Sequence, residues 1–369
     1  MPEMKTVAVI GLGASGLVTM KNLTEEGFDV SGFERSSSIG GVWSYEDTLT
    51  KTTALKSTCA NGSKYKFCFT DFPYSSGSTT PPILQLQNQL HTVQTEWNFN
   101  DNLPPFTQRL PLMNDNIVAA MHEGRIIPVS NLTQVLDAQT VLLSDGTTIS
   151  DLDAIICCTG YKPDFSILGN YEAQFSRIYH CLLKDHSEGD SSAPSSARFL
   201  PRLYQNIFSL DYPDSLAYIC GVGFQMPMFH VYDLASMALA QVWKGAVPLP
   251  PLETMRAQVE QHYQWIVSRA RQGSIHPDLV QASEWYLRAN ETAGTGVYQK
   301  LGYGVERWKF WWRDRVFCNT LMYEMFSPHT YRLFDGSRRR KWDGARAEIL
   351  RVIKEINEMG SDVGREKEP

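Results

Sequence analysis

Three glycines and one acidic residue near the start of the chain have the spacing of a dinucleotide site. Gly11, Gly13 and Gly16 directly follow an apolar run in VAVIGLGASGLVTMKNL. In such a turn the first glycine permits a tight bend, the second lets backbone approach a pyrophosphate, and the third lets the next helix pack closely. The pyrophosphate then meets free N–H groups at the helix N-terminus. Glu34 follows at the distance where a carboxylate can accept hydrogen bonds from a ribose.

These residues need a strand, a turn, a helix and a second strand to position them. Residues 5–10 have the pattern of a short buried strand, and apolar residues recur at helical spacing across 17–23. Gly27 ends the expected helix, and residues 28–34 are predicted to form the second strand. This β-α-β context favours a ligand-binding fingerprint over a glycine-rich turn without a ligand.

The residues after Glu34 help to distinguish between the two dinucleotides that this fingerprint can bind. FAD and NAD(P) both fit the first glycine turn. The segment ERSSSIGGVW adds a second glycine pair, Gly40 and Gly41, and then Trp43. A simple nicotinamide dehydrogenase does not need this pair, whereas a longer flavin must pass close to backbone. The sequence therefore favours FAD.

At these residues the sequence resembles the flavin-containing (dimethylaniline-type) monooxygenases, FAD enzymes that oxygenate soft nucleophiles. The resemblance is carried by GLGASG, ERSSSIGGVW, KSTCANGSKYKFCFTDFP and CCTGYKPDF. It covers residues 5–75 and about 110–245, and more loosely 326–335. It implies an α/β fold: a Rossmann-like FAD-binding domain of the two-dinucleotide-binding flavoprotein type, followed by a helical C-terminal region.

The resemblance also implies roles for individual residues. The glycine turn and Glu34 would hold the adenosine diphosphate half of FAD, and Asn61 would lie beside the reactive edge of the flavin as the catalytic residue. A loop asparagine that caps a turn and an ordinary core aromatic remain the alternatives for Asn61 and Trp43. The implied cofactor-binding residues are Gly11, Gly13, Ala14, Ser15, Gly16, Glu34, Arg35, Val42, Trp43, Asn61, Gly62, Thr159 and Gly160.

The family's second glycine fingerprint, for NADPH, has no match in this chain. Gly221-x-Gly223, Gly294-x-Gly296 and Gly302-x-Gly304 all lack the third glycine. In the family the NADPH domain separates two parts of the FAD domain, whereas here only residues 74–124 separate the two matching segments. The missing piece has the size of a domain. The predicted organisation is an FAD domain (1–75 and 110–245), an irregular connection (76–109), a helical region (246–357) and a polar tail (358–369).

The rest of the chain carries further strand and helix patterns. Short β-branched runs predict strands within 125–130, 133–138, 139–149, 153–160 and 215–223, with a hairpin turn at Asp145-Gly146. We expect the strands of 125–159 to form a meander that closes the FAD domain. Helical periodicity predicts helices over 229–245, 252–272, 278–291 and 343–357. The aromatic-rich residues 306–317 are predicted to pack in a core, with a substrate pocket as the alternative.

Three functions are compatible with the sequence. In the first, FAD reduced by NADPH or by a separate reductase reacts with molecular oxygen, and a flavin C4a-hydroperoxide oxygenates a small organic substrate. In the second, the substrate itself reduces FAD in an oxidase, for which His230 and Tyr232 are the candidate bases. In the third, the chain is an inactive, truncated flavoprotein remnant. The intact glycine turn and Glu34 count against the third.

Composition excludes other classes of function. The net charge of −6 does not favour a nucleic-acid partner, and no apolar run is long enough to cross a bilayer. The N-terminus has no signal-peptide pattern, and the odd number of cysteines, seven, contains no C-x-x-C pair. We therefore expect reduced thiols and a cytoplasmic location. The eight histidines show no zinc-binding spacing, so no metal is expected.

Overall fold

The structure is a computed structural model of the chain. It describes residues 5–47, 53–54, 64–74, 117–130, 132–155, 202–219, 228–270, 279–324, 326–336 and 338–365. Among these residues, no helix has the length and apolar character that crossing a membrane requires.

The N-terminal β-α-β unit is confirmed. Strand β1 (Thr6–Ile10) leads through the glycine turn into helix α1 (Ala14–Glu25), and strand β2 (Asp29–Phe33) follows. The two strands are parallel, and their register pairs Thr6 with Asp29 and Ile10 with Phe33. Gly27 takes a positive φ of 88° directly after the helix, where a residue without Cβ bears no strain. The unit therefore places the glycine turn and Glu34 at the same end of the strand pair.

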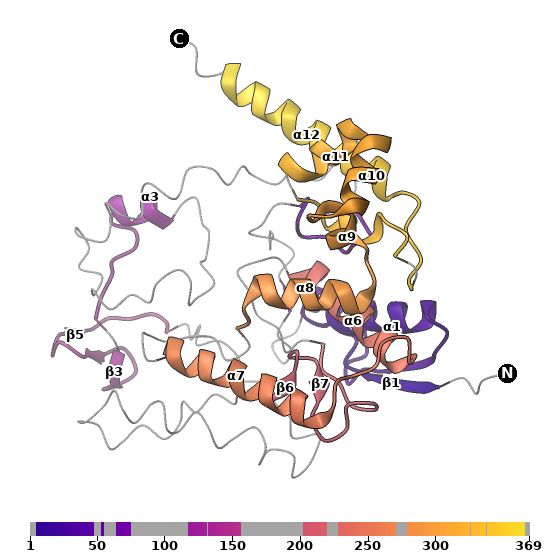
Figure 1. Cartoon of the computed structure of the whole chain (residues 1–369). Coiled ribbons are helices and arrows are strands. Elements are labelled where there is room, and N and C mark those ends of the chain that lie inside the picture. Colours follow the sequence, from indigo (N-terminus) through magenta and orange to yellow (C-terminus); the bar gives the residue numbers. More distant parts are fainter. Residues whose placement is uncertain are drawn as a thin grey trace.

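A second, separate sheet contains part of the expected meander. Strands β3 (Leu132–Val135), β4 (Val141–Leu143) and β5 (Thr148–Ile149) pair antiparallel in that order, with the predicted hairpin turn between β4 and β5. Residues 125–130 are not a strand, so that prediction is wrong; their apolar side chains face solvent without a partner strand. Within the described residues β1 pairs with β2 alone, and the meander lies at the opposite side of Figure 1. The described part therefore does not support closure of the FAD domain by this meander.

Helix α6 (Met228–Trp243) is the centre of the core. Most of its residues are fully buried, because the helix is apolar on nearly all sides. One side packs on α1, and another packs on α8 (Ala282–Ala293) and on the hairpin of β6 (Leu203–Tyr204) and β7 (Phe208–Ser209). The strand predicted over 215–223 is reduced, in its described part, to a single bridge between Ala217 and Phe208.

The C-terminal region is helical, as predicted. It contains α7 (Leu252–Ala270), α9 (Val297–Leu301), α10 (Val305–Arg313), α11 (Arg315–Tyr323), the 3-10 turn η4 (Pro328–Arg332) and α12 (Ala345–Arg365). The predicted helices over 252–272, 278–291 and 343–357 are confirmed, although α12 continues past 357 to Arg365. Helices α9 to α12 gather at one corner of the molecule (Figure 1).

Two short elements complete the described structure. They are the 3-10 turn η1 (Gly41–Trp43) and helix α3 (Ile117–His122). The core packing predicted for 306–317 is largely wrong, because α10 has no buried residue and only Phe317 in that span is a buried aromatic.

Candidate functional site

The glycine turn has the geometry that its sequence predicts. Gly11 has a φ of +87°, and its N–H donates to the carbonyl of Phe33 at 2.7 Å, which ties the turn to β2. A Cβ built on Gly16 would lie 1.9 Å from the carbonyl oxygen of Gly11. The first turn of α1 and the glycine turn therefore touch backbone to backbone, and any side chain at Gly16 would force them apart.

The N-terminus of α1 is open toward a ligand. Gly13 is the residue before the helix, no side chain caps this end, and the first turn has no acidic residue. The first helical hydrogen bond runs from the Leu17 N–H to the Gly13 carbonyl at 3.0 Å. The N–H groups of Ala14, Ser15 and Gly16 precede it and have no acceptor within the helix. Together with the helix dipole, these donors suit an anionic group.

Glu34 lies against this turn at the end of β2. One carboxylate oxygen accepts from the Leu12 N–H at 2.8 Å, and the other accepts from the Ser36 N–H at 2.9 Å. The hydrogen bonds from Ser36 and then Leu12 lower the pKa of Glu34, so the carboxylate is ionised at neutral pH. Because each carboxylate oxygen has two acceptor positions, Glu34 can still accept hydroxyl groups of a sugar.

A second glycine turn packs on the first. The Gly40 N–H donates to the Leu12 carbonyl at 2.8 Å, and a Cβ on Gly41 would come within 3.1 Å of the Gly13 Cα. Gly40 and Gly41 also have positive φ angles of 110° and 58°. This pair therefore lets the segment after Glu34 lie directly on the cradle, which we define as the turn 11–16 together with Glu34 and Gly40–Gly41.

The residues after the second turn are partly open to solvent. Val42 and Trp43 are each 49% exposed, and Arg35 is exposed on the loop between the two turns. The Trp43 ring lies edge-on to Phe229 of α6, with centroids 5.7 Å apart. Phe67 and Phe69 contact the same Phe229 ring, at 5.6 Å and 5.1 Å. An aromatic cluster from three segments therefore borders the cradle.

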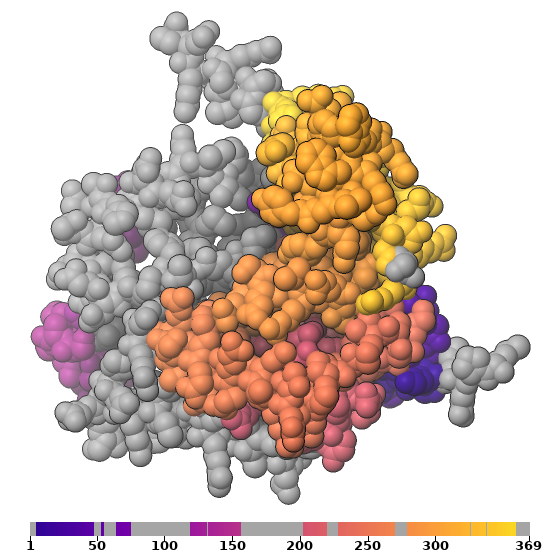
Figure 2. All heavy atoms as spheres, in the orientation of Figure 1, coloured from indigo at the N-terminus to yellow at the C-terminus, as the bar shows by residue number. Residues whose placement is uncertain are grey.

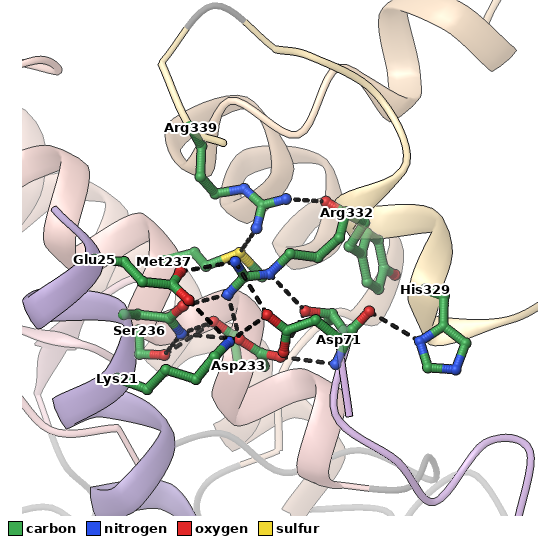
Figure 3. Close-up of polar contacts among 12 residues, drawn as sticks. Lys21, Glu25, Asp71, Asp233, Ser236, Met237, His329, Arg332 and Arg339 are labelled. Carbon is green, nitrogen blue, oxygen red and sulfur yellow. Dashed lines mark hydrogen bonds and ion pairs between the residues drawn. The ribbon is translucent and has the colours of Figure 1, made fainter. Parts of the chain in front are cut away.

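A buried polar network fixes the segment 64–74 to the helices beside the cradle (Figure 3). The Asp233 carboxylate of α6 is fully buried, and it accepts from the Thr70 N–H at 2.8 Å and the Thr70 hydroxyl at 2.6 Å. It also accepts from the Asn22 side chain of α1 at 2.8 Å. Arg332 of η4 lies 3.6 Å from Asp233 and donates to Thr70 at 3.0 Å. We call Asn22, Thr70, Asp233 and Arg332 the buried junction.

The charged groups of the buried junction stay ionised because each lies next to an opposite charge. Burial raises the pKa of Asp233, but the positive charges of Arg332 and Lys21 and the hydrogen bonds outweigh it, so the pKa is lowered overall. Arg332 also contacts Glu25 at 2.8 Å and Asp71 at 3.2 Å. Sequence reasoning did not find this junction. The available signal was Asp233 itself, an acid inside the apolar run FHVYDLASMALA.

His230, a candidate base, is a core residue. Its side chain is fully buried, and its Nε2 atom lies 3.0 Å from the Tyr286 hydroxyl. The His230 ring centroid lies 6.3 Å from that of Tyr286 and 6.2 Å from that of Tyr331, and the two tyrosine rings are themselves 6.2 Å apart. Burial lowers the pKa of His230 to about 4, so the imidazole is neutral. Tyr232, the other candidate, is half-buried and packs on the core cluster.

The remaining predicted site residues lie outside the described part of the chain. They are Asn61, Gly62, Thr159 and Gly160. Their predicted roles stay predictions.

Comparisons with known proteins connect this geometry to a family. The model of the flavin-binding monooxygenase-like family matches residues 4–79, which contain the whole cradle. Monooxygenase aurF of Gibberella zeae is 29% identical over 520 aligned positions, which cover 94% of this chain and 97% of that protein. Flavin-containing monooxygenase 3 of Macaca mulatta is 44% identical over 72 residues, which are 19% of this chain and only 14% of that protein.

A solved structure agrees at the level of fold. The S-allyl-L-cysteine S-oxygenase of Allium sativum superposes with a TM-score of 0.50 at 17% identity, covering 96% of this chain and 99% of that chain. The sequence relatives indicate that the protein is a flavin-dependent monooxygenase, which is an oxidoreductase. The chain is similar to flavin-binding monooxygenase-like proteins, over residues 4–79 in the family model and over most of its length in aurF, as its sequence motifs indicate.

Proposed function

We propose that this protein holds FAD in the cradle and uses it to oxygenate a small organic molecule with molecular oxygen. The observation that carries the proposal is the open N-terminus of α1, bordered by Glu34 and by Gly16 and Gly41, where an added Cβ would press on the backbone of the glycine turn. The pyrophosphate of FAD fits the N–H groups of Ala14, Ser15 and Gly16, and the ribose fits Glu34. We further propose that this unit belongs to a Rossmann-like, two-dinucleotide type of FAD domain.

The chain's own residues bind and orient, whereas the chemistry comes from the cofactor. Bound flavin, once reduced, supplies the electrons that place one oxygen atom on the substrate and release the other as water. The route through a flavin C4a-hydroperoxide is part of this proposal. Trp43, Phe67 and Phe69 form an apolar border that suits a flavin ring or an apolar substrate. Asn61 is proposed to orient the reactive edge of the flavin.

The electron source is the second part of the proposal. The alignment with aurF has 520 positions and this chain has 369 residues, so at least 151 aligned positions have no residue of this chain opposite them. Together these positions amount to the size of a domain. We propose that it corresponds to most of the family's inserted NADPH domain, and that NADPH reaches the flavin directly or a separate reductase supplies the electrons.

An absorption spectrum of the purified protein tests the proposal, followed by anaerobic addition of NADPH. A flavin band that NADPH bleaches supports both FAD binding and direct reduction. A band that persists with NADPH but bleaches with an added reductase assigns the electrons to a partner. A band that only an organic substrate bleaches would favour the oxidase alternative. No band, even after FAD is added, would refute the enzyme proposal and favour a remnant.

A further inference from the structure

Helix α10 leaves a stripe of its apolar side chains exposed, although Phe310 and Trp311 are half-buried. Four of its nine residues are aromatic, yet none of the nine is buried. Val305, Trp308 and Trp312 are 69%, 61% and 79% exposed. They follow one another at spacings of three and four residues, so they form one stripe along the helix. Exposed tryptophans in a row differ from the single exposed apolar residues that are normal on protein surfaces.

The stripe continues into a larger aromatic surface. Trp311 contacts Trp308 and Trp312, with ring centroids 5.9 Å and 5.5 Å apart. Other large apolar side chains of the same segment are also exposed, namely Tyr303, Val316 and Tyr323. We call residues 303–323 the aromatic knob. Its gold-coloured helices stand out at the upper corner of the molecule in Figure 2, so the surface that they present is convex.

The knob is also locally positive, although the whole chain is negative. Its helices carry Arg307, Lys309, Arg313 and Arg315 against Glu306 and Asp314. Both acids are engaged by cations: Glu306 pairs with Lys300 and Lys309 at 2.8 Å and 2.7 Å, and Asp314 pairs with Arg346 at 2.5 Å.

Two of the cations lie over aromatic rings of the knob. Arg307 lies 5.7 Å from the ring centroid of Tyr303, and Arg315 lies 4.8 Å from that of Trp311. The surface therefore combines apolar rings with positive charge, a pairing that suits the border between lipid chains and headgroups.

The combination of exposed apolar rings and positive charge indicates what kind of partner the aromatic knob binds. The knob presents six exposed large apolar side chains on a convex surface, beside the four basic residues Arg307, Lys309, Arg313 and Arg315. Tryptophan and tyrosine concentrate at membrane–water interfaces, and basic residues bind anionic lipid surfaces. We propose that the aromatic knob docks this protein on the surface of an anionic lipid bilayer.

Vesicle sedimentation with the full chain tests this proposal. The probes are vesicles of phosphatidylcholine alone and of phosphatidylcholine mixed with phosphatidylserine. The protein should sediment with the mixed vesicles, and added salt should release it, because salt screens the lysine and arginine contacts. The double variant Trp308→Ser/Trp312→Ser should bind about tenfold more weakly, since binding scales with the apolar area inserted. Lys309→Glu/Arg313→Glu should lose the preference for phosphatidylserine.

The double variant Ile127→Ser/Tyr212→Ser is the matched control. Its two residues are 75% and 54% exposed, lie outside the knob, and should not affect vesicle binding. Equal flavin content and thermal unfolding must accompany each comparison, so that a folding defect is recognised. Failure to bind mixed vesicles, or equal binding by the tryptophan variant, would overturn the proposal. A concentration-dependent dimer that the tryptophan variant abolishes would also overturn it, because the occupant would then be a second copy of the chain.

Discussion

The cradle and the buried junction lie on opposite ends of helix α1, and they are built in different ways. The cradle joins backbone groups that are near in sequence: Glu34 accepts from the N–H of Leu12, 22 positions away. The junction joins side chains across the chain: Asn22 meets Asp233 over 211 positions and Arg332 over 310. The cradle therefore depends on glycine and backbone shape, whereas the junction depends on paired charges within the core.

This difference predicts separate consequences of mutation. Changes in the cradle should reduce cofactor binding more than stability, because its N–H groups and Glu34 face the ligand site. Changes in the junction should reduce stability first, because every partner left behind is buried. Variants at Arg332, His230, Gly16 and Glu34 test this separation, in order of decreasing expected effect on stability.

Arg332→Met should destabilise the protein by about 3–5 kcal/mol, because it removes the cation that pairs with the buried Asp233 carboxylate and leaves only the charge of Lys21 to offset it. Urea unfolding measures the free energy of unfolding. Arg202→Met is the matched control: Arg202 pairs with Glu260 at 3.1 Å, but both side chains are about half exposed, so the loss should stay below about 1 kcal/mol. Similar losses of unfolding free energy in the two variants would contradict this prediction, because the buried Arg332–Asp233 pair would then stabilise the protein no more than an exposed pair does.

His230, one turn before Asp233 on α6, should make stability depend on pH. Its pKa is lowered by burial to about 4, with the Asp233 charge opposing and the Lys66 charge adding to the shift, so it stays neutral where the unfolded histidine takes up a proton. Stability should therefore fall by up to about 3 kcal/mol as pH drops from about 6.5 to about 4. Unfolding free energies measured across this window should show a smaller slope in His230→Gln. If the dependence of unfolding free energy on pH is unchanged in His230→Gln, other titratable groups cause the loss of stability at low pH.

The cradle was predictable from sequence because each of its parts carries a local signal. Glycines at fixed spacing and an apolar run ending at Glu34 identify β1, α1 and β2 without knowledge of the rest of the chain. Helical periodicity likewise identified α6, α7, α8 and α12. The junction was not predicted, because no local pattern shows that Thr70 and Arg332 meet the same carboxylate.

The wrong predictions have the same physical origin. Residues 125–130 have strand-like side chains, but a strand also needs a partner, and partners are set by distant sequence. In 306–317 aromatic content predicted burial, yet nothing within the described residues covers Trp308 and Trp312. The roles of Asn61, Gly62, Thr159 and Gly160 remain predictions from the resemblance alone.

Gly16→Ala should reduce both flavin content and stability, the latter by about 1–3 kcal/mol. The added Cβ would lie 1.9 Å from the Gly11 carbonyl oxygen, so the helix must shift away from the turn that receives the pyrophosphate. Gly304→Ala is the control, because Gly304 has extended backbone and nothing within 4 Å of a new Cβ. Flavin absorbance per protein and urea unfolding give the two readouts. A stable Gly16→Ala protein with full flavin would mean that the cofactor does not depend on this turn.

Glu34→Ala should produce the smallest change in stability and still weaken FAD binding about tenfold, which corresponds to about 1.4 kcal/mol. The carboxylate is held by the N–H groups of Leu12 and Ser36 on a partly exposed surface, so its removal leaves no buried charge. Glu123→Ala, which removes an exposed acid paired with Arg125, is the control. The dissociation constant can be measured by adding FAD to the apoprotein and following fluorescence quenching. If Glu34→Ala lowers the unfolding free energy of the apoprotein as much as Arg332→Met does, Glu34 serves mainly to stabilise the fold. If Glu34→Ala weakens only FAD binding, then the cradle serves cofactor binding and the buried junction serves stability, as their contacts indicate.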